Sequence, residues 1–392
     1  MTPNTAAELA TQALHKLLRA ADKHAAGTTS RRPALSGKAL ADYRQLPRLE
    51  DKETYDAIMA EAQAQGAITL HYPRHEAQGF IQRIELGDAE RLATILGKQT
   101  QTTKIRAAAA LLAADLAAHP VLHELIAAWK KLQNVRQTTP EDAARWHDAC
   151  QTVNWCRAQE RRGITESAVR DASAQLFQDS KRIEKLLPCL DVLLTGNLTG
   201  EARADTEILQ ELGLYREPQP VRLAGNVLLR RERGNFPPDA PYSALPPSAI
   251  CGLAAQPAQI LTIENLTTFH GWARQHSDSN TLCLYTAGMP SPAWRALYGR
   301  LLAELPPGVP VYHWGDIDEG GFRIAALLSR CAAACGHTLR PWKMRPAEIP
   351  ATQHRPASAH TITQMVKYAR DAGWEDMVRE LEDAGIVAEQ EG

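Results

Sequence analysis

The chain has 392 residues, with 44 Lys and Arg against 45 Asp and Glu, so its formal net charge is −1. This length predicts more than one domain. Because the charges balance, no global field attracts nucleic acid or an anionic membrane, and any site for a polyanion is a local patch. The seven cysteines form no C-x-x-C pair, which favours reduced thiols. No apolar run approaches the roughly 20 residues that a membrane helix needs, and we expect a cytoplasmic protein.

The first part of the chain is predicted to be helical with one short hairpin. A helix over residues 6–21 precedes a small, polar linker, and a helical period then runs up to Gln65, where Gly66 ends it. Two alternating runs, AITLHY and FIQRIEL, follow around a polar turn. A helix followed by such a hairpin suggests a winged helix, although other folds share the pattern. Residues 88–132 are rich in Ala and Leu, which predicts a helical arm or a small bundle.

A second helical block begins near Thr139 and Pro140, which supply a cap and a first-turn proline. Basic residues gather in this block, although basic clusters are usually solvated faces and are weak evidence for nucleic acid. They are Arg170, Lys181, Arg182 and Lys185 in the helical part, and Arg230 and Arg231 at the end of a predicted strand or hairpin. A proline-dense stretch follows and predicts a domain boundary near residues 234–248.

Beyond this boundary, strands and helices alternate. The runs AQILTI, NTLCLYTAG and VPVYHW have the apolar character of buried strands, and each is followed by a helical segment. Such alternation predicts a parallel sheet with right-handed crossovers. In sheets of this kind ligands bind beyond the carboxyl ends of the strands, which is where we expect the functional residues.

Three carboxylates follow two of these strands. Glu264 comes directly after AQILTI, and Asp316 and Asp318 come after VPVYHW, among glycines that allow tight turns. If the two strands are neighbours, the acids converge at one edge. Clustered carboxylates resist joint ionisation unless a cation neutralises them, and a few hard oxygen ligands suit Mg²⁺ or Mn²⁺. Capping of the next helix explains one aspartate, not both. His313, on the preceding strand, is expected to have a structural role.

The order strand-Glu, helix, strand-Gly, helix, strand-Asp-x-Asp resembles the toprim domain of topoisomerases, primases and related nucleases. Phosphatases of the haloacid dehalogenase kind carry Asp-x-Asp on their first strand, with Thr or Val where this chain has Gly320. A glycosyltransferase Asp-x-Asp explains neither Glu264 nor the two glycines. The sequence GDIDEGG is also not the G-x-G-x-x-G of a dinucleotide site.

The resemblance extends beyond toprim. The segments LFQDSKRIE, ILTIENLTTF, YTAGMPSPAW, YHWGDIDEGGFRI and VAEQE, in this order, resemble JetD, the nuclease subunit of bacterial Wadjet (MksG-like) plasmid-defence systems. JetD proteins are similar to the A subunit of topoisomerase VI, which joins a winged helix to toprim. The resemblance implies a multidomain α+β chain. Its expected parts are an N-terminal winged-helix-like domain (1–97), a helical arm (98–138), a winged-helix (CAP-like) DNA-binding domain (139–235) and an α/β toprim domain with a parallel sheet (236–392).

The same resemblance implies a homodimeric, metal-dependent DNA endonuclease that cleaves plasmid DNA together with condensin-like SMC, kleisin and KITE subunits. In that case Glu264, Asp316 and Asp318 would be the catalytic acids and would hold Mg²⁺ or Mn²⁺. The expected DNA-binding residues are Lys181, Arg182, Arg170, Arg230 and Arg231, and the further candidates for the site are Lys343, Glu389 and Glu391. Topoisomerase VI-type enzymes attack DNA with a winged-helix tyrosine, but this chain has no tyrosine between Tyr72 and Tyr215. A metal-activated water is therefore the expected nucleophile.

Two alternatives stay open. One is a non-catalytic DNA-binding subunit that recruits the motor and keeps a toprim-like scaffold, although a scaffold has no need for three crowded carboxylates. The other is a toprim enzyme of different chemistry. The lack of zinc-ribbon cysteines argues against a primase, and the missing tyrosine argues against a topoisomerase.

Overall fold

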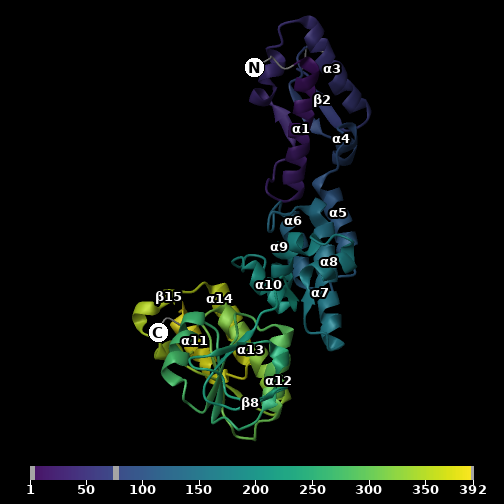
Figure 1. Cartoon of the computed structure of the whole chain (residues 1–392). Coiled ribbons are helices and arrows are strands. Elements are labelled where there is room, and N and C mark those ends of the chain that lie inside the picture. Colours follow the sequence, from purple (N-terminus) through teal and green to yellow (C-terminus); the bar gives the residue numbers. More distant parts are fainter. Residues whose placement is uncertain (1–4, 74–78, 390–392) are drawn as a thin grey trace. The chain divides into compact units, whose positions relative to one another are not determined.

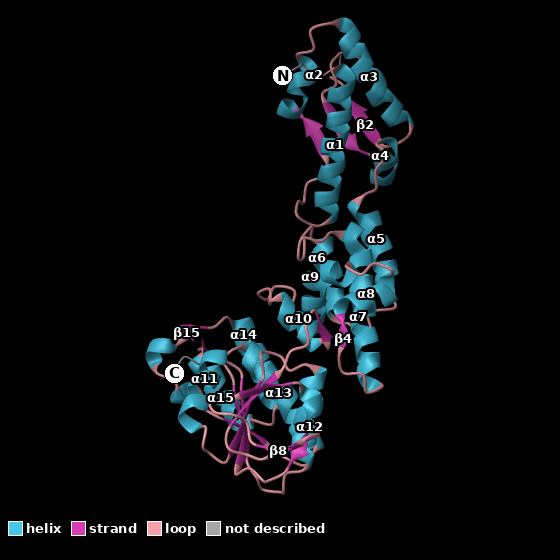
Figure 2. Cartoon of the chain, viewed as in Figure 1, coloured by secondary structure: helices cyan, strands magenta, loops and turns pink. Residues whose placement is uncertain are grey.

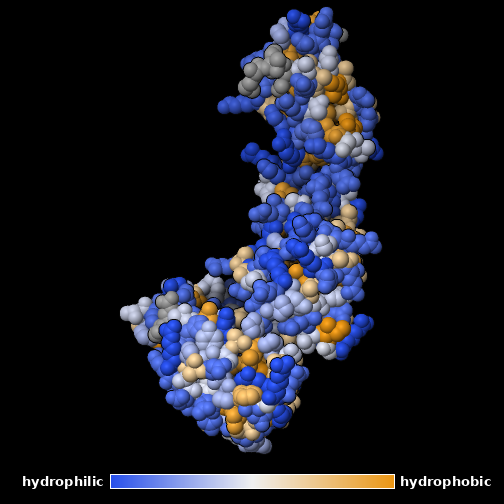
Figure 3. Space-filling model, viewed as in Figure 1, coloured by the Kyte–Doolittle hydropathy of each residue, from blue (hydrophilic) through white to orange (hydrophobic). Residues whose placement is uncertain are grey.

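The computed structural model describes residues 5–73 and 79–389 (Figure 1). The chain forms two compact units. Unit 1 consists of Met1–Gln151 with Pro188–Glu201, and unit 2 consists of Thr152–Leu187 with Ala202–Gly392. None of the described helices is long and apolar enough to cross a membrane. The face seen in Figure 3 is mostly hydrophilic, with hydrophobic residues in small separate patches.

Unit 1 contains a three-stranded antiparallel sheet packed against helices. Its first elements are α1 (Ala6–Ala25), β1 (Ala34–Ser36), α2 (Ala41–Arg44), α3 (Leu49–Ala64), β2 (Ile68–His71), β3 (Arg83–Leu86) and α4 (Ala89–Ile95). The strands pair in the order β1-β3-β2, and Ile84 of the middle strand pairs with Leu35 on one side and Leu70 on the other. These three side chains are buried with residues of α1 and α3, so one face of the sheet forms the core.

Local sequence explains where these elements begin and end. Thr5 and Glu8 form a reciprocal capping box that starts α1. Gly66 follows α3 with a φ of 72°, a conformation that favours glycine, so it ends the helix as its sequence position predicts. Tyr43 joins two parts of the core, because its buried hydroxyl donates to Asp56 Oδ1 at 2.7 Å and accepts the Ile81 N–H at 3.1 Å.

The rest of unit 1 is helical, as the Ala- and Leu-rich sequence predicts. It contains α5 (Gln101–Leu112), α6 (Val121–Lys130) and parts of α7 (Ala143–Arg161) and α9 (Arg182–Thr195). Two fully buried tryptophans converge on Thr138: the Trp129 indole donates to its carbonyl oxygen at 3.3 Å, and the Trp146 indole donates to its hydroxyl at 2.9 Å. Arg136 pairs with the buried Asp191 at 3.1 Å, which ties α9 to this bundle.

Unit 2 begins with a small α+β segment, residues 167–187 and 202–216. Its elements are β4 (Ser167–Ala168), α8 (Val169–Phe177), the first part of α9, α10 (Asp205–Glu211) and β5 (Leu214–Tyr215). Strands β4 and β5 pair in parallel. A tight turn joins α8 to α9: the Ser173 hydroxyl donates to the Asp179 carbonyl oxygen at 2.5 Å and accepts the Ile183 N–H at 3.1 Å. This turn fixes the start of α9, where Lys181 and Arg182 lie.

The remainder of unit 2 is built on a six-stranded sheet in the order β14-β13-β11-β12-β6-β9. Its strands are β6 (Val221–Ala224), β9 (Ser243–Leu245), β11 (Gln259–Ile263), β12 (Thr281–Tyr285), β13 (Val311–Trp314) and β14 (Leu339–Pro341). The strands β14, β13, β11 and β12 are parallel to one another, which confirms the predicted parallel sheet. The strands β6 and β9 extend it in the antiparallel sense.

Helices cover both faces of this sheet (Figure 2). On one face Leu261 and Ile263 pack against Phe269 of α11 (Leu266–His276). On the other face lie α12 (Pro292–Ala303), α13 (Glu319–Ala334), α14 (Ala359–Asp371) and α15 (Glu375–Ala384), which share the largest core with Ile260 and Val311. The central strands β11 and β12 are buried on both faces, and their sequences are accordingly mostly apolar.

The sheet starts earlier in the chain than the sequence suggested. Strand β6 lies before the expected boundary at 235/236, yet it pairs with β12 through Leu223 and Leu284. The run that follows forms part of a separate three-stranded sheet, in the order β10-β7-β8, from β7 (Leu229–Arg231), β8 (Gly234–Phe236) and β10 (Ile250–Leu253). A four-residue strand carries too little periodicity to reveal which sheet it joins.

Candidate active site at the carboxyl end of the sheet

The two strands that precede the acids are hydrogen-bonded neighbours. Strand β11 pairs with β13 in parallel, with Ile263 opposite Trp314, and the Glu264 N–H donates to the Trp314 carbonyl oxygen at 3.0 Å. Glu264 and Gly315 therefore leave the sheet side by side. The sequence predicted that the acids converge if these two strands are neighbours. They are neighbours, and parallel neighbours end at the same edge of the sheet.

Glu264 projects from this edge toward the turn that carries the aspartates. Its Oε2 accepts the Asp316 N–H at 3.2 Å. Burial, followed by the charges of Asp318 and Asp316, raises the pKa of Glu264 well above its ordinary value of 4.5. A Cβ on Gly315 would lie only 3.0 Å from that Oε2, so a side chain here would collide with the carboxylate. His313 Nε2 would lie even closer to that Cβ, at 2.8 Å, so glycine at this position lets both side chains pack against the backbone.

Asp318 has a second role as the N-cap of α13. Its Oδ1 accepts the Gly321 N–H at 2.7 Å. Burial raises the pKa of Asp318, and the charge of Glu389 raises it further. A Cβ on Gly321 would lie 2.2 Å from the Asp316 carbonyl oxygen, so the second of the two glycines allows the turn to fold back on itself. Asp318 is thus held close to the helix start rather than turned fully toward Glu264.

The C-terminal segment closes over the same turn. Ile317, between the two aspartates, exchanges backbone hydrogen bonds with Ala388 at 2.8 and 2.9 Å. This pairing places Glu389 near Asp318, and Glu389 also accepts a hydrogen bond from Arg355 at 2.9 Å. Glu391 lies outside the described residues. The structure therefore brings one of the two C-terminal acids to the acidic edge.

The acids share an edge, but they do not form a closed ligand cage. Within residues 5–73 and 79–389, no three His, Cys, Asp or Glu side chains are grouped so that they could enclose a metal ion. Glu264 and Asp318 each accept a hydrogen bond from a backbone N–H instead.

His313 and Lys343 also border this edge. His313 is fully buried: its Nδ1 lies 2.9 Å from the Thr262 hydroxyl, and burial lowers its pKa to about 3. Lys343 has a φ of 52°, unusual for a residue with a side chain, and its Nζ lies 4.7 Å from the centroid of the Trp314 ring. The imidazole therefore supports the strand in its neutral form, and the lysine carries a positive charge to the last residue of β13.

The predicted DNA-binding residues differ in the surroundings of their side chains. Arg170 on α8 and Lys181 are exposed, and Arg182 begins α9. Arg230, in contrast, donates to Glu304 at 2.5 Å and to the Leu253 carbonyl oxygen at 3.1 Å. Arg231 likewise donates to the Pro237 carbonyl oxygen at 3.2 Å and stacks on Phe236. The structure thus gives Arg230 partners at the end of α12 and on β10, and gives Arg231 partners on and just after β8.

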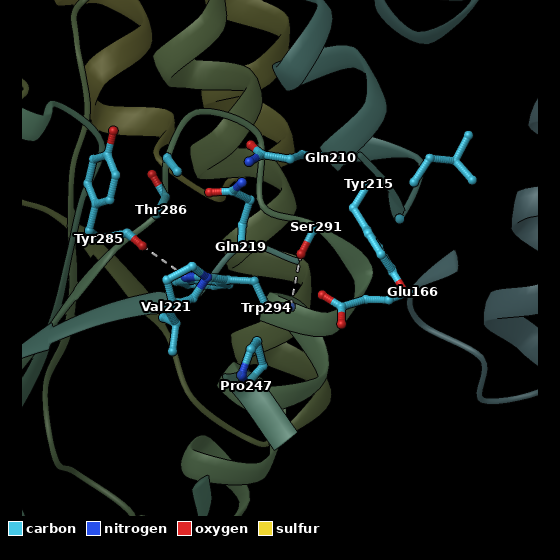
Figure 4. A pocket seen from close by; sticks show the side chains of 14 residues that line it. Glu166, Gln210, Tyr215, Gln219, Val221, Pro247, Tyr285, Thr286, Ser291 and Trp294 are labelled. Carbon is cyan, nitrogen blue, oxygen red and sulfur yellow. Dashed lines mark hydrogen bonds between the residues drawn. The ribbon is translucent and has the colours of Figure 1, made fainter. Parts of the chain in front are cut away.

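A pocket of about 50 Å³ lies beside the carboxyl end of β12 (Figure 4). Gln210 and Tyr215, from α10 and β5, line it on one side, and Tyr285 and Thr286, at the end of β12, line it on the other. The Trp294 indole donates to the Tyr285 carbonyl oxygen at 3.0 Å and forms part of its wall. Packing between the α8–α10 segment and the sheet is therefore incomplete at this point.

Two acids of α10 were not identified from the sequence. After burial and the charges of Asp318 and Asp316, the charge of Glu207 makes a smaller contribution to the raised pKa of Glu264. Glu211 accepts hydrogen bonds from Arg203 and from Arg323 of α13, and these two charges hold its pKa below the ordinary value despite its burial. No local pattern marks these residues, because Glu211 and Arg323 are 112 positions apart in the sequence.

Comparison with known proteins finds similarity in the C-terminal part of the chain. Residues 214–389, which include the six-stranded sheet and Glu264, Asp316, Asp318 and Glu389, match the family model described as Wadjet protein JetD, C-terminal. This part of the chain is therefore similar to the JetD family. The chain is also 31% identical over 224 residues to Wadjet protein JetD of Bacillus cereus (strain Q1), an alignment that covers 54% of this chain and 49% of that protein. The chain thus spans about half the length of its JetD relative, and the JetD match begins at the start of β5.

Proposed function

We propose that this chain is the metal-dependent DNA endonuclease of a Wadjet-type anti-plasmid defence system. The observation that carries the proposal is the parallel pairing of β11 with β13, which brings Glu264 to the turn that holds Asp316 and Asp318. The similarity of the C-terminal part to the JetD family supports the defence role. In this proposal the three acids carry out hydrolysis of plasmid DNA.

The domain assignments are part of the proposal. The order β1-β3-β2, with α2 and α3 between β1 and β2, supports a winged helix at the N-terminus. The α8-turn-α9 pair and the short strands β4 and β5 support a second winged-helix (CAP-like) domain. Four parallel strands with Glu and Asp-x-Asp at their ends support a toprim domain.

The residues at the edge fit a hard divalent cation, Mg²⁺ or Mn²⁺. Carboxylate oxygens are the preferred donors for these ions, and the raised pKa values of Glu264 and Asp318 mean that a nearby positive charge would favour their ionised forms. A bound cation would supply an activated water and would neutralise charge on the phosphate. Glu264, Asp316 and Asp318 would hold it, and Glu389, whose charge raises the pKa of Asp318, is a further candidate ligand. Lys343 would stabilise the phosphate from the other side of β13.

DNA contact is assigned to the exposed start of α9. Lys181 and Arg182, with Arg170 on α8, would bind phosphates without reading sequence. Two copies of the chain related by a two-fold axis would match the symmetry of a duplex and cut both strands. Condensin-like SMC, kleisin and KITE subunits of the same defence system are the proposed partners.

One observation favours a second candidate, a non-catalytic DNA-binding subunit that recruits the motor. Among the described residues the acids do not already enclose a metal site. A scaffold would keep this fold and its positive charges and would bind DNA without cutting it.

Incubation of the purified chain with supercoiled plasmid and Mg²⁺ or Mn²⁺, alone and with the other proteins of its operon, separates the two candidates. We expect linear product that enters a gel without protease treatment and accepts ligase. Glu264→Gln should abolish cleavage and preserve DNA binding. Asp278→Asn, an exposed acid just before the amino end of β12, is the matched control and should cleave normally. Ends that stay bound to protein, or equal cleavage by both variants, would overturn the assignment.

A further inference from the structure

A buried ion pair joins the α8–α10 segment to the helix that begins at the acidic edge. Glu211 is the last residue of α10, and its side chain is only 13% exposed. Its Oε1 accepts a hydrogen bond from Arg323 Nη2, and its Oε2 accepts one from Arg203 Nη1 at 2.7 Å. Both oxygens are therefore occupied by guanidinium groups. An anion in such a place is retained only with its partners, because a buried charge without a partner is costly.

The two arginines differ in what they connect. Arg203 lies just before α10, so its bond to Glu211 closes the ends of α10 on each other. Arg323 lies on α13, five residues after Asp318, which caps that helix. Only the Arg323 bond crosses from the segment that carries the proposed DNA-binding residues to the helix that carries a proposed catalytic acid.

Other contacts around α10 leave this bond with a positioning role. The pocket beside β12 leaves packing incomplete between Gln210 and the end of the sheet, whereas Gly213, after α10, lies against Pro292 of α12. Arg216 pairs with Glu184 at 2.9 Å and with Asp205 at 3.4 Å, but all three residues belong to the same segment. The segment is thus held together internally, and the ion pair to α13 contributes to its position relative to the acidic edge.

We propose that Glu211 and Arg323 form a clamp that holds the α8–α10 segment in register with the acidic edge. This inference rests on the proposed function. Without the clamp, DNA bound at the start of α9 would no longer present its phosphate at the distance from Glu264 and Asp316 that hydrolysis requires. A displacement of about 1 Å is enough to lower the rate of a positioned reaction up to about a hundredfold. Glu211 and Arg323 are positioning residues and do not touch the reacting phosphate.

Two single substitutions separate the clamp from the general stability of α10. Arg323→Gln removes the bond to α13 and leaves Glu211 paired with Arg203. Arg203→Gln removes the other bond of the same carboxylate and leaves the clamp, so it is the matched control. The double variant Glu211→Gln with Arg323→Gln removes both charges of the clamp. It replaces Arg323→Gln in the measurements if that single variant folds poorly.

The first measurement does not depend on nuclease activity. Spin labels at Gln175→Cys on α8 and Asp371→Cys at the end of α14, both exposed positions, report the distance between the segment and the rest of unit 2. Cys251, which is exposed, is replaced by Ser in all samples. We expect a narrow distance distribution for the parent chain and for Arg203→Gln, and a broader one for Arg323→Gln and for the double variant. An unchanged distribution in both clamp variants would overturn the inference even if the parent chain cuts DNA.

The second measurement uses single-turnover cleavage of supercoiled plasmid with Mn²⁺, and fluorescence anisotropy with a labelled duplex. Arg323→Gln should cleave roughly ten- to a hundredfold more slowly, with duplex affinity within about twofold of the parent, because the phosphate-binding side chains are intact. Equal loss in Arg203→Gln would indicate a stability effect and refute the clamp. Absence of cleavage in the parent chain, together with the expected spin-label result, would refute the nuclease assignment and leave the clamp standing.

Discussion

Replacement of Asp318 separates two roles that one side chain performs. Asp318 caps α13 through Gly321, and its charge is disfavoured by burial and by Glu389. Asn caps helices about as well as Asp but carries no charge. Ala provides neither a cap nor a charge. We therefore expect Asp318→Asn to leave the thermal stability of the metal-free protein unchanged or slightly raised, and Asp318→Ala to lower it.

The magnitude follows from the cap. Loss of an N-cap costs about 1 kcal/mol of unfolding free energy. For a unit of this size that corresponds to a melting temperature about 2–4 °C lower for Asp318→Ala than for Asp318→Asn. The proposed metal adds a second contrast, because a ligand at a hundred times its Kd stabilises a protein by about 2.7 kcal/mol. Saturating Mn²⁺ should raise the melting temperature of the parent chain and have little effect on either variant.

Scanning calorimetry of the parent chain, Asp318→Asn and Asp318→Ala, each in EDTA and in Mn²⁺, gives the six melting temperatures. If Asp318→Asn melts at as low a temperature as Asp318→Ala in EDTA, capping of α13 is not how the Asp318 side chain contributes to stability. If Mn²⁺ raises the melting temperature of Asp318→Asn as much as that of the parent chain, Asp318 is not a ligand. Asp278→Asn controls for the removal of a negative charge elsewhere in unit 2.

Three further predictions concern other residues. The folded-state pKa of Glu264 is raised. Its contribution to the stability of the metal-free protein is therefore full below about pH 4.5 and is lost as pH rises through the raised pKa. Denaturant titrations should show that the unfolding free energy changes less with pH in Glu264→Gln than in the parent chain. Lys181→Glu with Arg182→Glu should weaken binding to every duplex and reduce the slope of log affinity against log salt concentration by about one unit per lost phosphate contact. The control, Lys367→Glu with Arg370→Glu on α14, should change neither. An unchanged slope in the first variant would show that Lys181 and Arg182 belong to an ordinary solvated face. Tyr43→Phe should destabilise unit 1 by about 1–3 kcal/mol because it leaves the Ile81 N–H without its buried acceptor, and a loss below about 0.5 kcal/mol would contradict this.

Part of the acidic edge was predictable because Glu264 and Asp316 each closely follow an apolar strand. Glu264 and Asp316 mark strand ends in the sequence, and a parallel sheet places such ends together. The sequence could not show that β11 and β13 are the neighbours, since strand order depends on long-range pairing. It also could not show that Asp318 bonds to the helix start, because the same Asp suits a cap and a metal.

Contacts between distant parts of the chain escaped the sequence altogether. Glu211 and Arg323 have no shared motif, and Ile317 meets Ala388 through backbone atoms, which carry no side-chain signature. Strand β6 is short and joins a sheet whose other members all come later in the chain. Arg230 and Arg231 resembled a DNA-binding pair because a run of arginines looks the same whether its partners are phosphates or, as here, Glu304 and a backbone carbonyl. Their proposed role in DNA binding stays a prediction.

The pairing of Ile317 with Ala388 affects the order in which the acidic edge is assembled. During synthesis, Glu264 and the two aspartates leave the ribosome well before the segment that closes over them. The turn between the aspartates can take its final form only after Ala388 has emerged and bonded to Ile317. A chain without Ala388 would carry the three acids without this closure, so the edge is completed only after both of these distant segments have been made.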